Sequence, residues 1–576
     1  MGSINCKEYK TNKKNAACAQ ENDGDTGSYK FRSESDMEDI IEKVVCNESD
    51  IQENQMKQLN FDEDSKILLI KQNGKLTAIG NKCSHYGAPL HTGSLGDGRV
   101  RCPWHGACFN TETGDIEDFP GLDSIPCYKV KVEKDGQVKV QAKKSALDKN
   151  KRIKDMVKRD ENNDKTFIVV GGGPSAGVCV ETLRQEGFTG RIVMICKENT
   201  QPYDRVKVSK TLDTDVSKMQ FRNMDFYNEY SIELMLGVEA TKLDANAKIV
   251  TCSNGYAIKF DKIYIATGSQ AVKVPIPGYE LENIFTVRDH ADAVAINPLI
   301  SKDLDVVCLG SSFIALEAAA ALVKKVKSVT LIGRDNVPLK PSFGDEIGER
   351  VLQLFKDNNV NMIMNSGVKQ ILGTNGKVSE VELIDGTKIP CGMCIMGVGS
   401  RCYTDFLKDS GIAINPNGSI DTDIHLKTNI DDIYVGGDIA NAPVYTIGNE
   451  RATIGHYQLA QYHGRIAAMN MAGKAEELQA VPYFWTMLFG KSFRYSGYGK
   501  AASIKIVGSV QDLKFVAFYL DEQNNVISTA SCNRDPVVSQ YADLVAMGKK
   551  LHKDDLEVED PFAWTQSLMK TDARVC

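Results

Sequence analysis

Short apolar runs give the middle of the chain its pattern. Four of them, at residues 167–170, 191–196, 305–309 and 328–332, have the length and composition of buried strands. An amphipathic pattern at 178–185 follows the first run and predicts a helix, and a second helix is predicted at 316–324 after the third run. A strand, a helix and a second strand, occurring twice, predict two α/β Rossmann-like domains.

The flanking regions have a different pattern. Apolar runs at 66–70 and 76–79, joined by Asn73-Gly74, predict a β-hairpin in a small all-β domain. Near the other end, strands are predicted at 513–518 and 526–530 and a helix near 536–547, which together indicate an α+β domain. The expected fold class is multidomain: all-β, then two α/β units, then α+β, where the first and last classes are implied by the family resemblance that the motifs below carry.

Composition places the boundaries between these units. Residues 1–37 are polar and predict a disordered tail, and the charge-rich segment 143–164 predicts a solvated linker. As a coil that linker would reach about 25 Å and let the all-β domain dock and leave. These two segments bound the all-β unit at 38–142, and the family resemblance that the motifs below carry implies 165–298 and 425–480 for the first α/β unit, 299–424 for the second, and 481–576 for the last.

Overall charge and apolar content exclude some functions. The net charge of −7 argues against a general nucleic-acid binder, and no apolar run reaches the length of a membrane span. Gly2 fits the position for myristoylation, although Cys6 replaces the usual Ser or Thr and could itself be acylated. Peripheral membrane contact and a plain disordered tail are thus the two alternatives. We expect a cytoplasmic protein, with mitochondria or a membrane surface as alternative locations.

The turn after the first strand is typical of a dinucleotide site. Gly171 permits the tight turn, Gly173 lets the backbone approach a pyrophosphate, and Ala176 allows close packing of helix and strand. The free N–H groups at the helix start would face the phosphates. Glu198, after the second strand, could hold a ribose hydroxyl.

The second dinucleotide unit is less regular. Its glycine pattern has become Gly310, Ser312 and Ala315, and Ser312 reduces how closely a nucleotide can approach. Arg334 follows the next strand where an NAD site usually has an acid. Because an arginine there can accommodate a 2′-phosphate, we expect NADPH rather than NADH, and NADH stays open.

Two cysteines and two histidines form a pattern of metal ligands. Cys83 and His85 are followed, after sixteen residues, by Cys102 and His105. This set could hold a [2Fe–2S] cluster with two histidines on one iron, or a zinc ion. The surrounding loops, at 83–89 and 102–109, resemble those of Rieske proteins, which implies the cluster. Ala88 and Trp104 stand where high-potential Rieske proteins have bridging cysteines, so the resemblance is to the ferredoxin type.

Residues 201–210 resemble a segment of flavoprotein reductases of the ferredoxin-reductase and apoptosis-inducing-factor type. The resemblance implies that Arg205 lies along FAD and that Lys210 lies near its reactive ring, although Val206 replaces the usual proline. It also implies that Glu317 faces Lys210 across the site. Lys210 and Glu317 are therefore the predicted catalytic residues.

Two further stretches carry the same resemblance. Residues 266–268 read Ala-Thr-Gly, which implies that Thr267 and Gly268 lie where the chain leaves the FAD domain. Residues 428–438 resemble the second FAD motif, in which Gly437 and Asp438 contact the cofactor and the aspartate holds the ribitol chain. Tyr457 matches an aromatic position near the flavin. Cys391 and Cys394 have redox-motif spacing but lie in an apolar strand, and are expected to be structural.

The order of these motifs resembles that of the Rieske-bearing apoptosis-inducing-factor-like proteins. The resemblance implies an FAD-dependent NAD(P)H oxidoreductase that passes electrons through FAD to the cluster and on to an unknown protein or small-molecule acceptor. In some members the C-terminal domain supports dimerisation, so the resemblance allows a homodimer without deciding the oligomeric state. The alternative is a redox- or nucleotide-sensing signalling protein, linked to cell death, with slow turnover.

Overall fold

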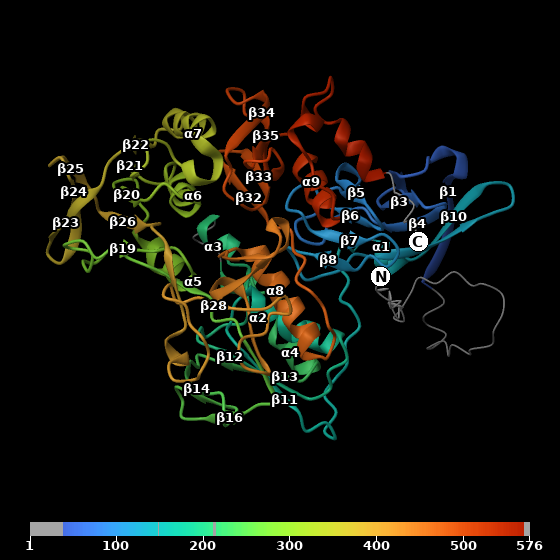
Figure 1. Cartoon of the computed structure of the whole chain (residues 1–576), viewed down its shortest axis with the longest axis horizontal. Helices are drawn as coiled ribbons and strands as arrows, with labels where there is room; N and C mark the ends of the chain where they lie inside the picture. The colour runs from blue at the N-terminus through green and yellow to red at the C-terminus, as the bar shows by residue number, and fades with distance from the viewer. Residues whose placement is uncertain (1–38, 148, 211–214, 570–576) are drawn as a thin grey trace, which may run out of the picture.

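The computed structural model describes residues 39–147, 149–210 and 215–569, so Gly2, Cys6 and the predicted tail lie outside the described residues. Figure 1 shows the N-terminal domain in blue beside the C-terminal domain in red, with the two α/β units below them and to their left. In the part of the chain that is described, no helix is both long enough and apolar enough to cross a membrane.

The N-terminal domain consists of two antiparallel sheets. The larger has the order β1-β10-β9-β4-β3-β2, from β1 (Ile40–Asn47), β2 (Gln55–Asn60), β3 (Lys66–Gln72), β4 (Lys75–Gly80), β9 (Cys127–Val132) and β10 (Gln137–Lys143). The smaller comprises β5 (Ser94–Gly96), β6 (Arg99–Arg101), β7 (Cys108–Asn110) and β8 (Ile116–Asp118).

The predicted hairpin is present, and its geometry explains its sequence. Asn73 and Gly74 have φ of 53° and 70°, the left-handed values that a two-residue hairpin turn needs. Strand β3 is apolar on both faces because it separates two cores. Ile67 and Leu69 pack into one core, while Leu68 and Ile70 face the core beneath the cysteine and histidine loops.

The first α/β unit has a parallel sheet in the order β13-β12-β11-β17-β29. Its strands are β11 (Thr166–Val170), β12 (Arg191–Cys196), β13 (Ile232–Leu236), β17 (Lys262–Ile265) and β29 (Ile433–Val435). Helices α2 (Pro174–Gln185) and α8 (Tyr457–Met471) pack closely against each other, since a Cβ on Gly464 would lie 2.1 Å from the carbonyl oxygen of Ser175. Strand β29 comes after the second unit in the sequence, so the chain returns from that unit to complete this sheet.

The second α/β unit repeats the design with the order β19-β26-β20-β21-β22. Its elements are β19 (Ile284–Phe285), β20 (Asp305–Leu309), β21 (Ser328–Ile332), β22 (Asn361–Ile363), β26 (Met393–Met396), α5 (His290–Ile296), α6 (Phe313–Leu322) and α7 (Lys340–Asp357). Smaller sheets decorate both units: β14 (Ala240–Asp244), β15 (Ile249–Cys252) and β16 (Ala257–Lys259), and β23 (Val368–Thr374), β24 (Lys377–Leu383) and β25 (Lys388–Pro390).

The C-terminal domain is an antiparallel sheet with the order β32-β33-β36-β35-β34 and a helix. Its elements are β32 (Tyr483–Leu488), β33 (Lys491–Gly497), β34 (Ser503–Ser509), β35 (Lys514–Leu520), β36 (Val526–Cys532) and α9 (Val537–Ala546). Helix α9 contacts both this sheet and strand β5 of the N-terminal domain. It therefore lies at the junction of the two domains.

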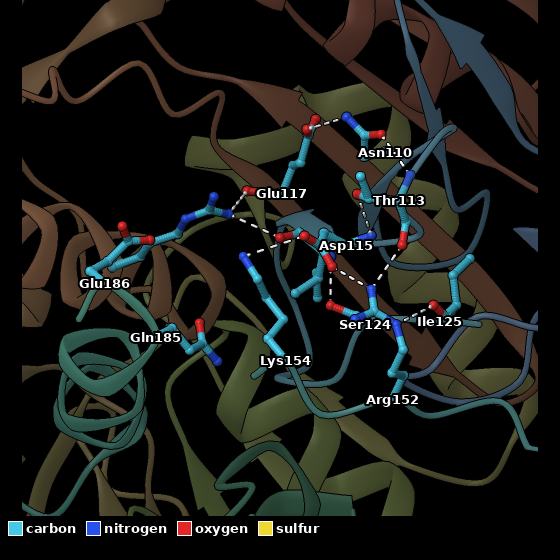
Figure 2. Close-up of polar contacts among 12 residues, drawn as sticks. Asn110, Thr113, Asp115, Glu117, Ser124, Ile125, Arg152, Lys154, Gln185 and Glu186 are labelled. Atoms are coloured by element: carbon cyan, nitrogen blue, oxygen red, sulfur yellow. Dashed lines mark hydrogen bonds and ion pairs between the residues drawn. The ribbon is translucent and has the colours of Figure 1, made fainter. Parts of the chain in front are cut away.

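The expectation of a freely reaching linker was wrong. After α1 (Lys144–Leu147), the guanidinium of Arg152 donates to the carbonyl oxygens of Thr113 (2.8 Å) and Ile125 (3.1 Å) and pairs with Asp115 (Figure 2). Further on, the backbone N–H of Val157 donates to the carbonyl of Arg184 at 3.1 Å. The charge of Arg152 thus fastens the segment to the N-terminal domain, and a backbone hydrogen bond fastens it to the first α/β unit.

Candidate functional site

Two similar loops present the predicted cluster ligands. In the first, the N–H of Cys83 donates to the Ala88 carbonyl (2.9 Å); in the second, the N–H of Cys102 donates to the Ala107 carbonyl (2.7 Å). Each loop turns at a glycine with positive φ, 78° at residue 87 and 81° at residue 106. The glycines are needed because other residues rarely adopt these values.

The four predicted ligands converge as two pairs. The thiols of Cys83 and Cys102 are in hydrogen-bond contact, and the Nδ1 atoms of His85 and His105 lie 3.1 Å apart. Burial lowers the pKa of His85 to about 3 and that of His105 to about 2, so both imidazoles are neutral and able to bind a metal. Among residues 39–147, 149–210 and 215–569, no three His, Cys, Asp or Glu side chains converge as a single-ion site would need. The paired arrangement fits a two-iron cluster.

A cavity of about 790 Å³ lies where the first dinucleotide motif ends, and Thr267, Gly268 and Gly437 are among its lining residues. Gly171 has φ 137°, and a Cβ there would lie 2.3 Å from the Ala266 carbonyl oxygen, so the turn requires glycine. A Cβ on Gly173 would meet only the Arg205 side chain, at 3.9 Å, which leaves the backbone open to a ligand. Ala176 is buried below the turn and does not line the cavity. This cradle fits a dinucleotide phosphate.

The two predicted catalytic residues meet at the cavity wall. Lys210 Nζ lies 2.7 Å from Glu317 Oε1. Thr486 donates to the same oxygen at 2.7 Å, and Ser209 donates to Oε2 at 2.8 Å. Glu317 is buried with both carboxylate oxygens satisfied, so it holds the lysine ammonium in a fixed position.

The other predicted cavity residues are held by polar contacts. Asp438 accepts from Ser269 Oγ (2.8 Å) and from Arg288 Nη2 (2.6 Å); no motif had indicated this arginine. Arg205 pairs with Glu198, whose other oxygen accepts from the Tyr203 hydroxyl at 2.7 Å. Tyr457 lines the cavity and is hydrogen-bonded to Asp204.

The residues predicted for the nicotinamide nucleotide lie apart from these. Gly310 has φ 104°, and Ser312 Oγ donates to the Gly397 carbonyl at 2.9 Å, which fixes the loop before α6. Ala315 is buried against Gly397, and Arg334 is exposed after β21. None of the four lines the large cavity, although Glu317 on the same helix α6 does. They therefore form a second group, on the neighbouring domain.

An aromatic side chain that the motifs did not indicate joins the cavity to the ligand loops. The indole of Trp485 packs against the His105 ring, with 3.9 Å between centroids and 34° between planes. Lys210 Nζ lies 4.8 Å from the same indole centroid, and Trp485 lines the cavity. Little in the sequence points to Trp485. It is one of three tryptophans, and the stretch around it was predicted only to be the start of the C-terminal domain.

Buried ion pairs hold the N-terminal domain against the rest. Arg101 Nε lies 2.7 Å from Asp543 on α9, and both side chains are only 1% exposed. Arg222 pairs with Asp123 at 2.8 Å, and Arg494 donates to the Trp104 carbonyl at 2.8 Å. The ligand loops are therefore docked on the cavity.

Comparisons with known proteins agree with this geometry. The family described as pyridine nucleotide-disulphide oxidoreductase matches residues 165–464, and the Rieske [2Fe-2S] domain matches residues 42–129. Apoptosis-inducing factor 3 of Homo sapiens is 38% identical over 90% of this chain and 86% of its own. The 3-phenylpropionate/cinnamic acid dioxygenase ferredoxin--NAD(+) reductase component of Photorhabdus laumondii is 29% identical over 62% of this chain and 90% of its own.

A solved structure shares the fold. The covalent putidaredoxin reductase-putidaredoxin complex superimposes with a TM-score of 0.67 at 22% identity, over 71% of this chain and 100% of that chain. These matches confirm the resemblance that the motifs indicated, and the Rieske match decides for the cluster over zinc. The roles of the individual site residues stay predictions.

Proposed function

Because this chain belongs to the pyridine nucleotide-disulphide oxidoreductase family and to the relatives of apoptosis-inducing factor 3, with a Rieske [2Fe-2S] domain, we propose that one docked molecule carries out its whole electron transfer. The chain is an FAD-dependent NAD(P)H oxidoreductase that delivers electrons to its own Rieske cluster and on to a further acceptor. When bound, FAD accepts two electrons from nicotinamide and releases them singly to the cluster.

We assign the cofactors to the residues that the geometry brings together. Cys83, Cys102, His85 and His105 would hold the cluster. The turn at Gly171 and Gly173 would hold the FAD pyrophosphate, and Asp438 would accept a ribitol hydroxyl. In support, the buried donors match the cluster's chemistry, and the Gly173 backbone is open to the cavity.

The chain's own residues set the distance between the two sites. Glu317 fixes the Lys210 ammonium at the cavity wall, and that ammonium lies against the indole of Trp485. The same indole packs on the predicted ligand His105. This contact carries the proposal, because it makes a packed connection from the cavity to the cluster loops without an intervening solvent layer.

The nicotinamide is assigned to the second α/β unit. Gly310, Ser312 and Ala315 form the turn, and the exposed Arg334 is placed to meet a 2′-phosphate, which favours NADPH. The Photorhabdus laumondii relative, whose name specifies NAD(+), instead favours NADH. We propose NADPH because this chain carries Arg334 at that position.

Substitution of Trp485 tests the connection. In anaerobic stopped-flow mixing with NADPH, Trp485→Leu should slow cluster reduction relative to flavin reduction by roughly tenfold to a hundredfold, since small displacements of reacting partners cost this much. Trp564→Phe, at a tryptophan buried in another core, is the matched control and should leave the ratio at the wild-type value. A Trp485→Leu protein with the wild-type ratio would rule out this connection.

A further inference from the structure

The two ligand histidines differ in what covers them. His105 is covered by Trp485, which leads inward to the cavity. His85 is covered by Tyr86, whose ring stacks on the imidazole with 3.8 Å between centroids and 17° between planes. Tyr86 is 39% exposed and is not among the residues that line the cavity. One histidine therefore faces the reductase and the other faces the surface.

Because the domains are docked, the side chains that cover the two histidines decide where an external protein can approach the cluster. His105 is buried, whereas His85 is only partly covered. Trp104 is also exposed, at 38%, but its ring lies 6.3 Å from His105 between centroids, and its carbonyl is tied to Arg494 of the C-terminal domain. Tyr86 is the exposed aromatic that is in stacking contact with a ligand.

The surface around Tyr86 is cationic although the whole chain is not. Lys207 Nζ lies 5.9 Å from the Tyr86 centroid. Lys151, whose side chain is 58% exposed, pairs with Asp123 at 3.7 Å, and the Asp123 carbonyl accepts from Ser84, the neighbour of His85. The nearby carboxylates are buried: Asp123 also pairs with Arg222 at 2.8 Å, and Asp204 accepts from the Tyr86 hydroxyl at 2.6 Å. Two lysines thus lie beside the ligand loop on a protein whose formal net charge is −7.

We propose that the surface formed by Tyr86, Lys151 and Lys207 is where an acidic one-electron carrier protein binds and takes electrons from the cluster. This surface is called the exit face below. The step transfers one electron from the cluster to the acceptor, with no covalent bond made or broken. Cationic residues around an exposed aromatic suit a transient interface with an acidic protein. The proposal rests on the proposed function, since it presumes a cluster bound between His85 and His105.

Salt dependence distinguishes the exit face from the charge of the whole molecule. Holoprotein reduced with dithionite is mixed anaerobically with acidic plastocyanin or with basic cytochrome c, and cluster oxidation is followed optically. The exit face predicts that the plastocyanin rate falls as salt increases and that the cytochrome c rate rises. The opposite signs would mean that the net negative charge governs the encounter, and would overturn the proposal.

Charge-reversal variants locate the effect. Lys151→Glu and Lys207→Glu should lower the plastocyanin rate at low salt by about tenfold, within the range that electrostatic steering supplies. Lys377→Glu, at an exposed lysine of the second α/β unit, carries the same charge change and should leave the rate unaltered. Equal effects of all three variants would overturn the assignment.

Two further measurements do not depend on turnover. Carbodiimide cross-linking with redox-inert, cadmium-substituted plastocyanin should join Lys151 or Lys207 to the partner, and cross-links confined to other lysines would overturn the proposal.

Tyr86→Leu should slow cluster oxidation by both plastocyanin and cytochrome c, while the cluster potential, from an EPR titration, stays at the wild-type value. A wild-type oxidation rate in Tyr86→Leu, or a slower rate in Trp104→Leu instead, would overturn the proposal. Because these experiments start from dithionite-reduced protein, failure of NAD(P)H to reduce the cluster would be seen separately.

Discussion

The buried ion pair between Arg101 and Asp543 gives a sharp prediction about docking. Asp543 lies on α9 of the C-terminal domain, and its carboxylate meets Arg101 Nε at 2.7 Å with both side chains 1% exposed. Arg101 also donates to Asp118 (2.7 Å) and to the Gly106 carbonyl (3.0 Å), beside the ligand His105. Asp543→Ala removes the one partner that belongs to the other domain.

The size of the effect follows from this geometry. Removing one member of a buried pair typically costs about 3–5 kcal/mol, because the other charge is left in a low dielectric. Since Asp118 still pairs with Arg101, we expect a loss at the lower end of this range, about 3 kcal/mol in the free energy of docking. That corresponds to roughly a hundredfold weaker docking of the N-terminal domain.

The assay uses the Rieske domain's own signal. Urea titration followed by visible circular dichroism of the cluster, with proteolysis of segment 143–164 as a second probe, should show undocking of Asp543→Ala at lower urea than wild type. Glu557→Ala is the matched control, because its pair with Lys505, at 3.4 Å, lies at the surface and contributes little to stability. The double variant Arg101→Met/Asp543→Leu should recover most of the loss. If Asp543→Ala behaves like Glu557→Ala, the pair does not hold the domains together.

Four further predictions test the site. His85→Ala should abolish the Rieske EPR signal while FAD stays bound; an unchanged signal would refute the ligand assignment. Asp438→Ala should weaken FAD retention by about tenfold or more, as loss of a charged hydrogen-bond acceptor costs about 1.5–3 kcal/mol, and full occupancy after dialysis would make this aspartate dispensable. Arg334 should give NADPH a preference of roughly five- to thirtyfold in kcat/KM, from about 1–2 kcal/mol, which Arg334→Glu should erase; a wild type that prefers NADH tenfold would contradict it. Burial lowers the pKa of His463 to about 4, and its Nδ1 accepts from the Gly437 N–H. This neutral histidine stabilises the fold fully above about pH 6.5, and the contribution, on the order of 3 kcal/mol, should be lost as pH falls toward 4. Thermal unfolding from pH 4 to 7 should therefore be less acid-sensitive in His463→Gln than in wild type, and an equal slope would refute the role.

The local motifs were readable from the sequence because their chemistry is local. Gly171 needs its positive φ, and the spacing of Cys83, His85, Cys102 and His105 reflects two short loops that each close on themselves. The match to the Rieske domain confirmed the interpretation of that spacing.

Contacts between distant segments could not be read in the same way. Trp485 meets His105 across 380 positions, and Asp543 meets Arg101 across 442, and neither pair leaves a pattern in a single sequence. Segment 143–164 was misjudged for the same reason: its composition shows charges, but the partners of Arg152 lie in a domain that precedes it. Tertiary partners decide whether a charged segment is solvated or fastened.

The central claim is that electrons reach the cluster inside one docked molecule. The most direct test is the rate of cluster reduction after anaerobic mixing with excess NADPH, followed by rapid-freeze EPR over a wide range of protein concentrations. Transfer within one docked molecule predicts a first-order rate that does not change with protein concentration. A rate that rises in proportion to protein concentration would show transfer between molecules and contradict it.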